Sequence, residues 1–130
     1  MNGLIIRRPW IDLILSGEKT WEMRSRNTEI RGRIALIGKG AKAVTGVAEL
    51  VDLRPNLSLA ELRSSFAKHR VPEDELSCED FKWTTAWVLS GAQTLEQPVP
   101  YHHRVGAVIW VRLEPEVVVS IEEQLRARCR

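Results

Sequence analysis

The sequence predicts a single α+β domain, a small and mostly antiparallel β-barrel with helices at its periphery. Its 130 residues fit one domain that is long enough to bury a hydrophobic core. Five or six segments have strand character, which is typical of a small sheet or barrel. Between strands, helical patterns occur only after the first strand and in the middle of the chain. The repeated strand–helix–strand unit of a wound parallel sheet is therefore not indicated.

The first quarter of the chain combines two strands with one short helix. Residues 3–7 are a strand candidate, and 9–16 is predicted to be a helix. Pro9 suits the first helical position, because its missing N–H would be unpaired there in any case. Gly17 then supplies a left-handed residue that ends the helix. The period changes to two over 19–24, which predicts the second strand.

The rest of the chain combines further strands with two helices. A capping box that begins at Ser58 predicts a helix to about Arg70, and another at Ser120 predicts a helix over 120–128. The whole chain, 1–130, is one domain in this interpretation, with its core in about 4–113. The remaining strands are expected at 33–37, 44–53, 84–89 and 106–113, with a long loop between the last two.

Composition excludes several classes of protein. Hydrophobic content of 44% and charged content of 28% are those of an ordinary globular protein, and no apolar run approaches the ~20 residues that span a bilayer. Met1 leads straight into a strand without a signal peptide, so we expect a cytoplasmic protein that does not contact membranes. Cys78, Cys129, His102 and His103 lack metal-ligand spacing, and we expect neither a metal nor a cofactor.

Basic residues are concentrated at the start of the chain. Residues 1–42 hold nine Lys and Arg against four Asp and Glu, although the whole chain carries only +2. Residues 43–100 hold nine acidic residues against five basic ones. If the first third forms one face, that face suits phosphate, and random scatter over the surface is the alternative. The segment 38–42, with two glycines and two lysines, is predicted to be a hairpin turn with incidental ligand contact.

Three charged residues after the first helix form a compact pattern. Glu22 and Arg24 point to one face of the predicted strand and lie about 7 Å apart, with Lys19 at the mouth of the strand. Trp21 and Met23 point to the other face. A carboxylate between two cations can hold both in fixed orientations and leave their outer donors free for an anion. A solvated edge with ordinary surface ion pairs is the alternative interpretation.

The same residues resemble the opening of an ASCH domain, a family of the PUA-like superfamily with the signature G-x-K-x-x-E-x-R. Gly17, Lys19, Glu22 and Arg24 match that signature. Further matches are Arg8-Pro9-Trp10, Arg31-Gly32, Ala86-Trp87-Val88-Leu89, Leu95-Glu96-Gln97-Pro98-Val99-Pro100 and Gly106 before a strand with Trp110. The resemblance covers about 4–113 and implies a PUA-like β-barrel and RNA binding. Some relatives are described as ribonucleases or as amidohydrolases of acetylated cytidine.

We therefore expect a module that binds RNA or a nucleotide-like ligand in a basic cleft at this strand. Lys19 and Arg24 would contact phosphate or a base edge, and Glu22 would orient them. An indole in or beside the cleft could stack a base. The other expected ligand-binding residues are Arg8 and Lys39 at the positive rim, Trp10 and Trp87 as stacking candidates, and Ser90 as a hydroxyl at a strand end. Trp83 is the other tryptophan that could line the cleft.

Two further functions are alternatives. A hydrolase of RNA or of N4-acetylcytidine would use Lys19 as its base or nucleophile, but the nearby Glu22 favours the charged amine and hence binding. The related amidohydrolases combine a lysine, a threonine and a glutamate. Here Glu22 occupies the threonine's position, although Thr20 is close. The carboxylate of the hydrolase would come from Glu49, Glu73, Asp74 or Glu75. The second alternative, a protein-interaction domain, would instead use the acidic segment 73–80.

Overall fold

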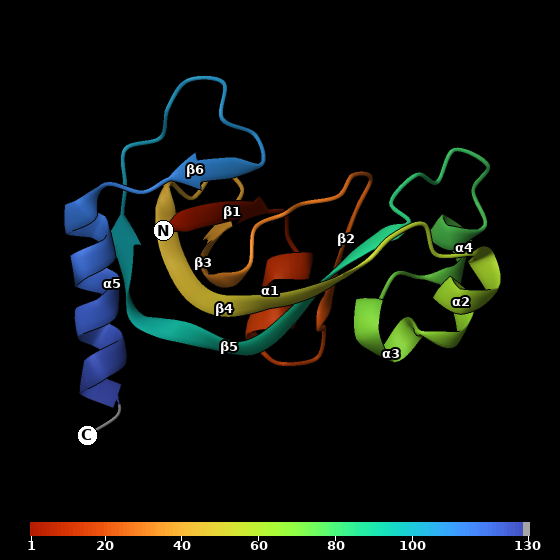
Figure 1. Ribbon diagram of the computed structural model, residues 1–130, viewed down its shortest axis with the longest axis horizontal. Coiled ribbons are helices and arrows are strands. Elements are labelled where there is room, and N and C mark those ends of the chain that lie inside the picture. Colours follow the sequence, from red (N-terminus) through yellow and green to blue (C-terminus); the bar gives the residue numbers. More distant parts are fainter. Residues whose placement is uncertain (129–130) are drawn as a thin grey trace.

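The computed structural model describes residues 1–128, which form six strands and five helices (Figure 1). The predicted α+β class is confirmed. In chain order the elements are β1 (Asn2–Ile6), α1 (Trp10–Leu15), β2 (Trp21–Arg24), β3 (Gly32–Gly38), β4 (Ala43–Arg54), α2 (Leu59–Ser64), α3 (Phe66–His69), α4 (Glu73–Leu76), β5 (Thr85–Pro100), β6 (Trp110–Arg112) and α5 (Pro115–Arg128).

All six strands form one sheet in the order β2-β5-β4-β3-β1-β6. Only β1 and β3 run parallel, and every other neighbouring pair is antiparallel. Three register shifts between β4 and β5 allow these long strands to bend, because a bulge locally increases strand twist. The sheet curves into a half-barrel, as the sweep of β4 and β5 in Figure 1 shows. The predicted, mostly antiparallel barrel architecture is therefore confirmed.

Three hydrophobic clusters hold the helices against the sheet. α1 contributes Ile11 and Ile14 to the central cluster. α5 contributes a stripe at four-residue spacing, Val117, Ile121 and Leu125, to a cluster at one end of the molecule. At the opposite end, α2, α3 and α4 pack against β2 (Figure 1). The sheet thus lies between α5 at one end and the helices α2, α3 and α4 at the other, with α1 packed against its middle.

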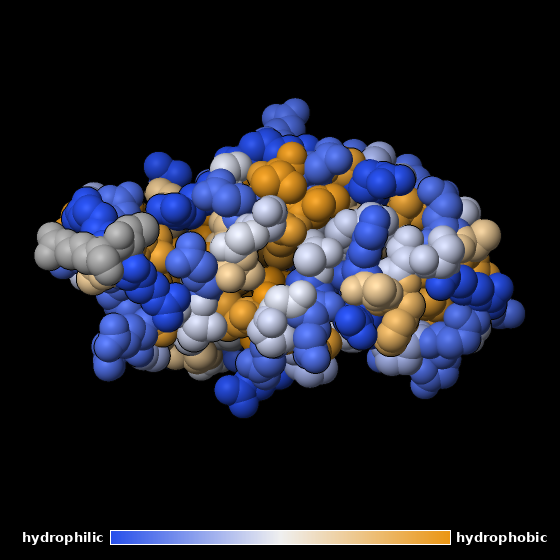
Figure 2. Space-filling view, turned by 90° about the horizontal axis from the view of Figure 1, so that it is seen from below, coloured by the Kyte–Doolittle hydropathy of each residue, from blue (hydrophilic) through white to orange (hydrophobic). Residues whose placement is uncertain are grey.

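One face of the molecule is covered mainly by hydrophilic side chains, with apolar side chains in patches between them (Figure 2). Among residues 1–128, no helix has the length and apolar character that a membrane span requires. The same residues contain no group of three or more His, Cys, Asp and Glu placed to hold a metal ion. Cys129 lies outside the described residues.

Strand β5 is longer than the strand predicted over 84–89, so the predicted end at residue 89 is wrong. It continues through Pro98 to Pro100, across a segment expected to be a loop. β2 pairs with β5 only over residues 85–88, so within residues 1–128 the later part of β5 has no neighbouring strand on that side, and prolines are tolerated at such an edge. At the other end of the sheet, β6 covers only residues 110–112 of the predicted strand 106–113.

Both longer helices also differ from the predicted ones. The capping box at Ser58 is confirmed. The Glu61 backbone N–H donates to the Ser58 hydroxyl at 3.1 Å, and the Ser58 backbone N–H donates to the Glu61 carboxylate at 3.1 Å. The helix is nevertheless broken at Ser65, where φ is −114°. The terminal helix begins at Pro115 rather than at Ser120. Proline suits a first helical turn, and the buried stripe of α5 already begins two residues later.

Candidate ligand-binding cavity

The turn between α1 and β2 sets the position of Lys19. α1 begins at Trp10, one residue after the predicted start at Pro9. Gly17 adopts a φ of +87°, the left-handed conformation that the sequence predicts at the helix end. The Lys19 backbone N–H then donates to the Leu13 carbonyl at 3.0 Å. Lys19 is therefore anchored to the last turn of α1 immediately before β2.

Alternation along β2 separates its apolar and charged side chains. Trp21 and Met23 pack into the cluster that holds Leu62 of α2 and Leu76 of α4. On the other face, Arg24 Nε donates to Glu22 Oε2 at 3.0 Å, and Arg24 Nη2 forms an ion pair with the same oxygen at 2.9 Å. Lys19 Nζ lies 3.9 Å from the second carboxylate oxygen, Oε1. The predicted arrangement of one carboxylate between two cations is therefore present in the structure.

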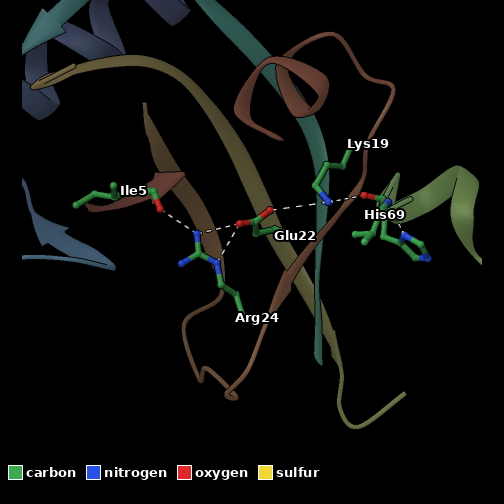
Figure 3. Close-up of polar contacts among 6 residues, drawn as sticks. Ile5, Lys19, Glu22, Arg24 and His69 are labelled. Atoms are coloured by element: carbon green, nitrogen blue, oxygen red, sulfur yellow. Dashed lines mark hydrogen bonds and ion pairs between the residues drawn. The ribbon is translucent and has the colours of Figure 1, made fainter. Parts of the chain in front are cut away.

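The two cations on either side of Glu22 also donate to backbone carbonyls (Figure 3). Arg24 Nη2 donates to the Ile5 carbonyl of β1 at 2.9 Å, and Lys19 Nζ donates to the His69 carbonyl of α3 at 2.6 Å. The row of polar contacts thus joins β1, β2 and the helices beyond them. Lys19 Nζ also lies 4.9 Å from the centroid of the Trp10 ring, a cation–π distance. We call Lys19, Glu22 and Arg24 the charged triplet.

The charged triplet is more deeply buried than a surface ion-pair cluster. Lys19 is 2% exposed and Glu22 is 5% exposed. Burial lowers the pKa of Lys19 from 10.5 to about 8; the Glu22 carboxylate raises it and Arg24 lowers it, both by less than burial does. Desolvation is therefore a larger effect than the attraction of Glu22, although with a pKa of about 8 the charged amine that the sequence predicts still predominates at pH 7. The burial of Lys19 and Glu22 excludes the alternative of a solvated edge.

His69 supports the carbonyl that Lys19 contacts. The imidazole is fully buried, and its Nδ1 accepts from the Val71 N–H at 2.9 Å. Its Nε2 therefore carries the hydrogen and donates to the Leu62 carbonyl at 2.6 Å. Burial lowers the pKa of His69, which keeps the ring neutral in this arrangement. The ring fixes α3 and, with it, the backbone oxygen that orients the Lys19 ammonium.

A cavity of about 460 Å³ opens over the charged triplet. Small-molecule sites in proteins have volumes of roughly 300–1,000 Å³, so a nucleoside-sized ligand fits. Trp10, Phe81 and Trp83 give the cavity aromatic surface, and Trp83 is 44% exposed. Its remaining charged and polar lining residues are Arg7, Lys39, Glu75, Cys78 and Asp80. We call this space the triplet cavity.

Comparison with known proteins identifies the family. The family model described as ASCH domain matches residues 4–99. The chain belongs to the ASCH domain family. The crystal structure of ASCH from Zymomonas mobilis superposes with a TM-score of 0.71 at 19% sequence identity, covering 94% of this chain and 93% of that one. A mutant form of that protein gives a TM-score of 0.70 at 20% identity, covering 94% of both chains. No curated protein matches the sequence.

Within this ASCH domain, five of the predicted binding residues line one cavity and three do not. Lys19, Glu22, Arg24, Trp10 and Lys39 line the triplet cavity. The three that lie elsewhere are Arg8, Trp87 and Ser90.

Each of these three residues has a different environment. Arg8 is exposed and lies 3.7 Å from Asp12. Ser90 is exposed on β5 and does not line the triplet cavity. Trp87 is 1% exposed, stacks on Trp110 with ring centroids 5.6 Å apart, and donates from Nε1 to a backbone carbonyl. The prediction that Trp87 stacks a base is therefore wrong, because its ring already belongs to the core.

Sequence reasoning missed several residues of the triplet cavity. Arg7, rather than Arg8, lines the cavity together with Ile5. Side chains two residues apart share a face of an extended chain, and that spacing could have distinguished the two arginines. Phe81 and Asp80 reach the cavity from the irregular segment after α4. No sequence period marks that segment, and only the packing of α4 against α2 brings it to β2.

Proposed function

We propose that this ASCH domain binds RNA, or a nucleotide-like ligand, by enclosing one base in the triplet cavity. The observation that carries the proposal is the charged triplet, with Lys19 and Glu22 buried, in a cavity that aromatic side chains also line. A base needs an apolar or aromatic surface for its face and hydrogen-bonding groups for its edge, and the cavity offers both. The half-exposed ring of Trp83 is the stacking surface that replaces the buried Trp87.

The charged triplet supplies unused donors and an acceptor. The Lys19 ammonium has three protons and donates one to the His69 carbonyl. Glu22 Oε1 lies 3.9 Å from Lys19 Nζ and makes no hydrogen bond within residues 1–128. A carboxylate accepts from the exocyclic amino group of a base, while an ammonium donates to a ring nitrogen or carbonyl oxygen. This pairing suits a base that carries an amino group.

A hydrolase is the second candidate, and the pKa of Lys19 favours it. With a pKa of about 8, roughly a tenth of the Lys19 amines are neutral at pH 7, enough for a general base. Of the carboxylates considered from the sequence, Glu75 lines the triplet cavity. Glu22 still occupies the position at which the related amidohydrolases have a threonine. Binding without turnover is therefore our first proposal.

The test of binding uses a fluorescently labelled, single-stranded RNA of mixed sequence. We expect Glu22→Gln to weaken binding at least tenfold, because a hydrogen bond to a charged group contributes about 1.5–3 kcal/mol. We expect Trp83→Ala to weaken binding by a similar factor through lost stacking. The control variants are Glu18→Gln and Phe66→Ala, which remove an exposed carboxylate and an exposed ring outside the cavity.

The measurements distinguish binding in the triplet cavity from nonspecific binding and from hydrolysis. Equal losses in the cavity variants and in their controls would contradict the proposal, as would an absence of RNA binding at low salt. Incubation with N4-acetylcytidine, and separately with unlabelled RNA, tests the hydrolase. Robust deacetylation or RNA cleavage that Lys19→Met abolishes would make catalysis, rather than binding alone, the function of the triplet cavity.

A further inference from the structure

A second hollow adjoins the triplet cavity. Its volume is about 330 Å³, and Ile5, Lys39 and Val108 line both spaces. The turn between β3 and β4 forms one side of the hollow, and the segment between β5 and β6 forms the other. The two spaces therefore adjoin each other at the N-terminal strand, and we call them together the depression. We call the second space the lysine hollow.

The lysine hollow differs from the triplet cavity in charge. Lys39 and Lys42 line it, and no carboxylate does so among residues 1–128. Three carboxylates line the triplet cavity, and one of them, Glu22, belongs to the charged triplet. The triplet cavity also has four cations, Arg7, Lys19, Arg24 and Lys39, so the difference is that only the lysine hollow offers an anion cationic groups without carboxylates among them. The charges divide the depression into an anion site and a mixed site.

Uncharged donors complete the lining of the lysine hollow. Tyr101 Oη lies 3.0 Å from His103 Nδ1. Burial raises the pKa of Tyr101, so its hydroxyl stays protonated. With that hydroxyl as the donor, His103 keeps its Nε2–H for a ligand. Two ammonium groups and an imidazole N–H are the donor types that bind phosphate oxygens.

The backbone holds these donors in place. The turn is closed by the Ala41 N–H donating to the Gly38 carbonyl at 2.9 Å. Gly40 has a φ of +83° and Lys42 a φ of +54°, so the chain takes two left-handed steps around the hollow. The Tyr101 N–H donates to the Lys42 carbonyl at 3.4 Å, which connects the two sides. Hydrogen bonds within the turn and between the two sides therefore fix the backbone around the hollow.

We propose that the lysine hollow binds the phosphate of the nucleotide whose base occupies the triplet cavity. This inference rests on the proposed function and narrows its ligand to a phosphate-bearing nucleotide, as opposed to a free nucleoside. A terminal phosphate and an internal phosphodiester share the chemistry that the lysines recognise. The shared lining residues place base and phosphate side by side, as in a single nucleotide.

The test compares probes that differ only in phosphate. The probes are the four ribonucleosides, their 5′- and 3′-monophosphates, and single-stranded hexanucleotides of mixed sequence, titrated at low salt. We expect monophosphates to bind at least tenfold more tightly than nucleosides. Tighter binding of the hexanucleotide than of either monophosphate would identify an internal phosphodiester as the natural ligand, and equal binding a terminal phosphate. Equal affinity for nucleosides and monophosphates would overturn the proposal.

A matched pair of variants assigns the effect to the hollow. Lys42→Asn removes the charge and keeps a residue that tolerates positive φ. It should weaken hexanucleotide binding about fivefold to tenfold and reduce the salt slope by about 0.7, the change for one phosphate contact on a single strand. Arg126→Gln on α5 makes the same charge change outside both spaces. Nucleoside binding should change less than twofold in either variant. Equal losses in the two variants would overturn the assignment.

Inorganic phosphate separates failure of this inference from failure of the proposed function. In amide NMR spectra it should shift the Gly40, Lys42 and His103 signals of the wild type and of Lys19→Met. If no nucleoside or RNA binds but these signals shift, the proposed function fails and the anion site stands. If nucleosides bind and phosphate shifts none of these signals, the proposed function stands and the lysine hollow is not an anion site.

Discussion

Lys19 is the residue at which stability and ligand binding conflict. A shift of its pKa from 10.5 to about 8 corresponds to roughly 3 kcal/mol by which the folded environment disfavours the ammonium. One hydrogen bond to a carbonyl and an ion pair at 3.9 Å only partly offset its desolvation. A side chain held at that cost to stability suggests selection for function. Because burial is the main cause of this pKa shift, the pH dependence of stability reports on the environment of Lys19 in the cavity.

We expect Lys19→Met to stabilise the protein and to abolish ligand binding. Methionine fills the space of the lysine stem, and Glu22 keeps its two contacts with Arg24, so no buried charge loses its only partner. The free energy of unfolding at pH 7 should rise by roughly 1–2 kcal/mol, the range for replacing a buried ion pair by apolar atoms. Urea denaturation of both proteins measures the change.

The stability difference should depend on pH in one direction. Below pH 8 Lys19 is charged in both states, and the full penalty applies. Between pH 8 and 10.5 the unfolded chain binds a proton that the folded protein has lost, so wild-type stability rises relative to Lys19→Met. Lys68→Met, at an exposed lysine, should show no such convergence. A Lys19→Met variant that is less stable by the same amount at pH 7 and pH 10 would contradict the assignment.

At the scale of elements, the close packing of α1 on the sheet positions the charged triplet. Gly46 of β4 lies directly beneath Leu15 of α1. A Cβ atom built at Gly46 would lie 2.6 Å from the Gln93 carbonyl oxygen and would also clash with Leu15 Cδ2. The absence of a side chain at Gly46 therefore lets α1 and β5 both approach β4. Because Lys19 hydrogen-bonds to the last turn of α1, this approach also sets the depth of the triplet cavity.

We expect Gly46→Ala to destabilise the fold by roughly 2 kcal/mol, since overpacking a tight site costs about 1–3 kcal/mol. The carbonyl of Gln93 belongs to a paired strand and cannot move aside as a flexible side chain can. Gly38→Ala is the control, because the atom nearest to its new Cβ would be the Cβ of Ala41, 3.7 Å away. Thermal unfolding measures both variants. An equal and small change in the two melting temperatures would show that α1 adjusts freely.

At the scale of the whole molecule, the uneven charge distribution of the sequence becomes a surface feature. All the basic residues that line the two spaces, Arg7, Lys19, Arg24, Lys39 and Lys42, come from residues 1–42. Glu75 and Asp80 come from the acidic middle segment and also line the triplet cavity. The depression therefore combines a basic half from the N-terminal strands with an acidic edge from the segment after the helices.

This distribution predicts salt-dependent RNA binding and nearly salt-independent nucleoside binding. Each phosphate contact on a single strand contributes about −0.7 to the slope of log K against log salt. An RNA with two to four phosphates on the depression should give a slope of roughly −1.5 to −3. Titrations at several salt concentrations measure it. A slope near zero for RNA would contradict phosphate contacts, whatever the affinity.

The sequence by itself determined the local features of this protein. Short-range rules place the helix end at Gly17, the capping box at Ser58 and the alternation that puts Glu22 and Arg24 on one face of β2. These features depend on neighbours within a few residues, and backbone sterics and hydrogen bonding fix them. The family signature and the α+β class follow from the same local patterns, because each pattern indicates one element and the elements have few ways to pack.

Only the tertiary structure decided the environment of those residues. Burial of Lys19 depends on α3, whose His69 lies 50 residues further along the chain. Trp83 lines the cavity and Trp87 is buried in the core, whereas the sequence favours Trp87 as the residue that stacks a base. The lysine hollow needs two segments about 60 residues apart. Desolvation and cavity shape arise from contacts that are distant in sequence, and no local pattern encodes them.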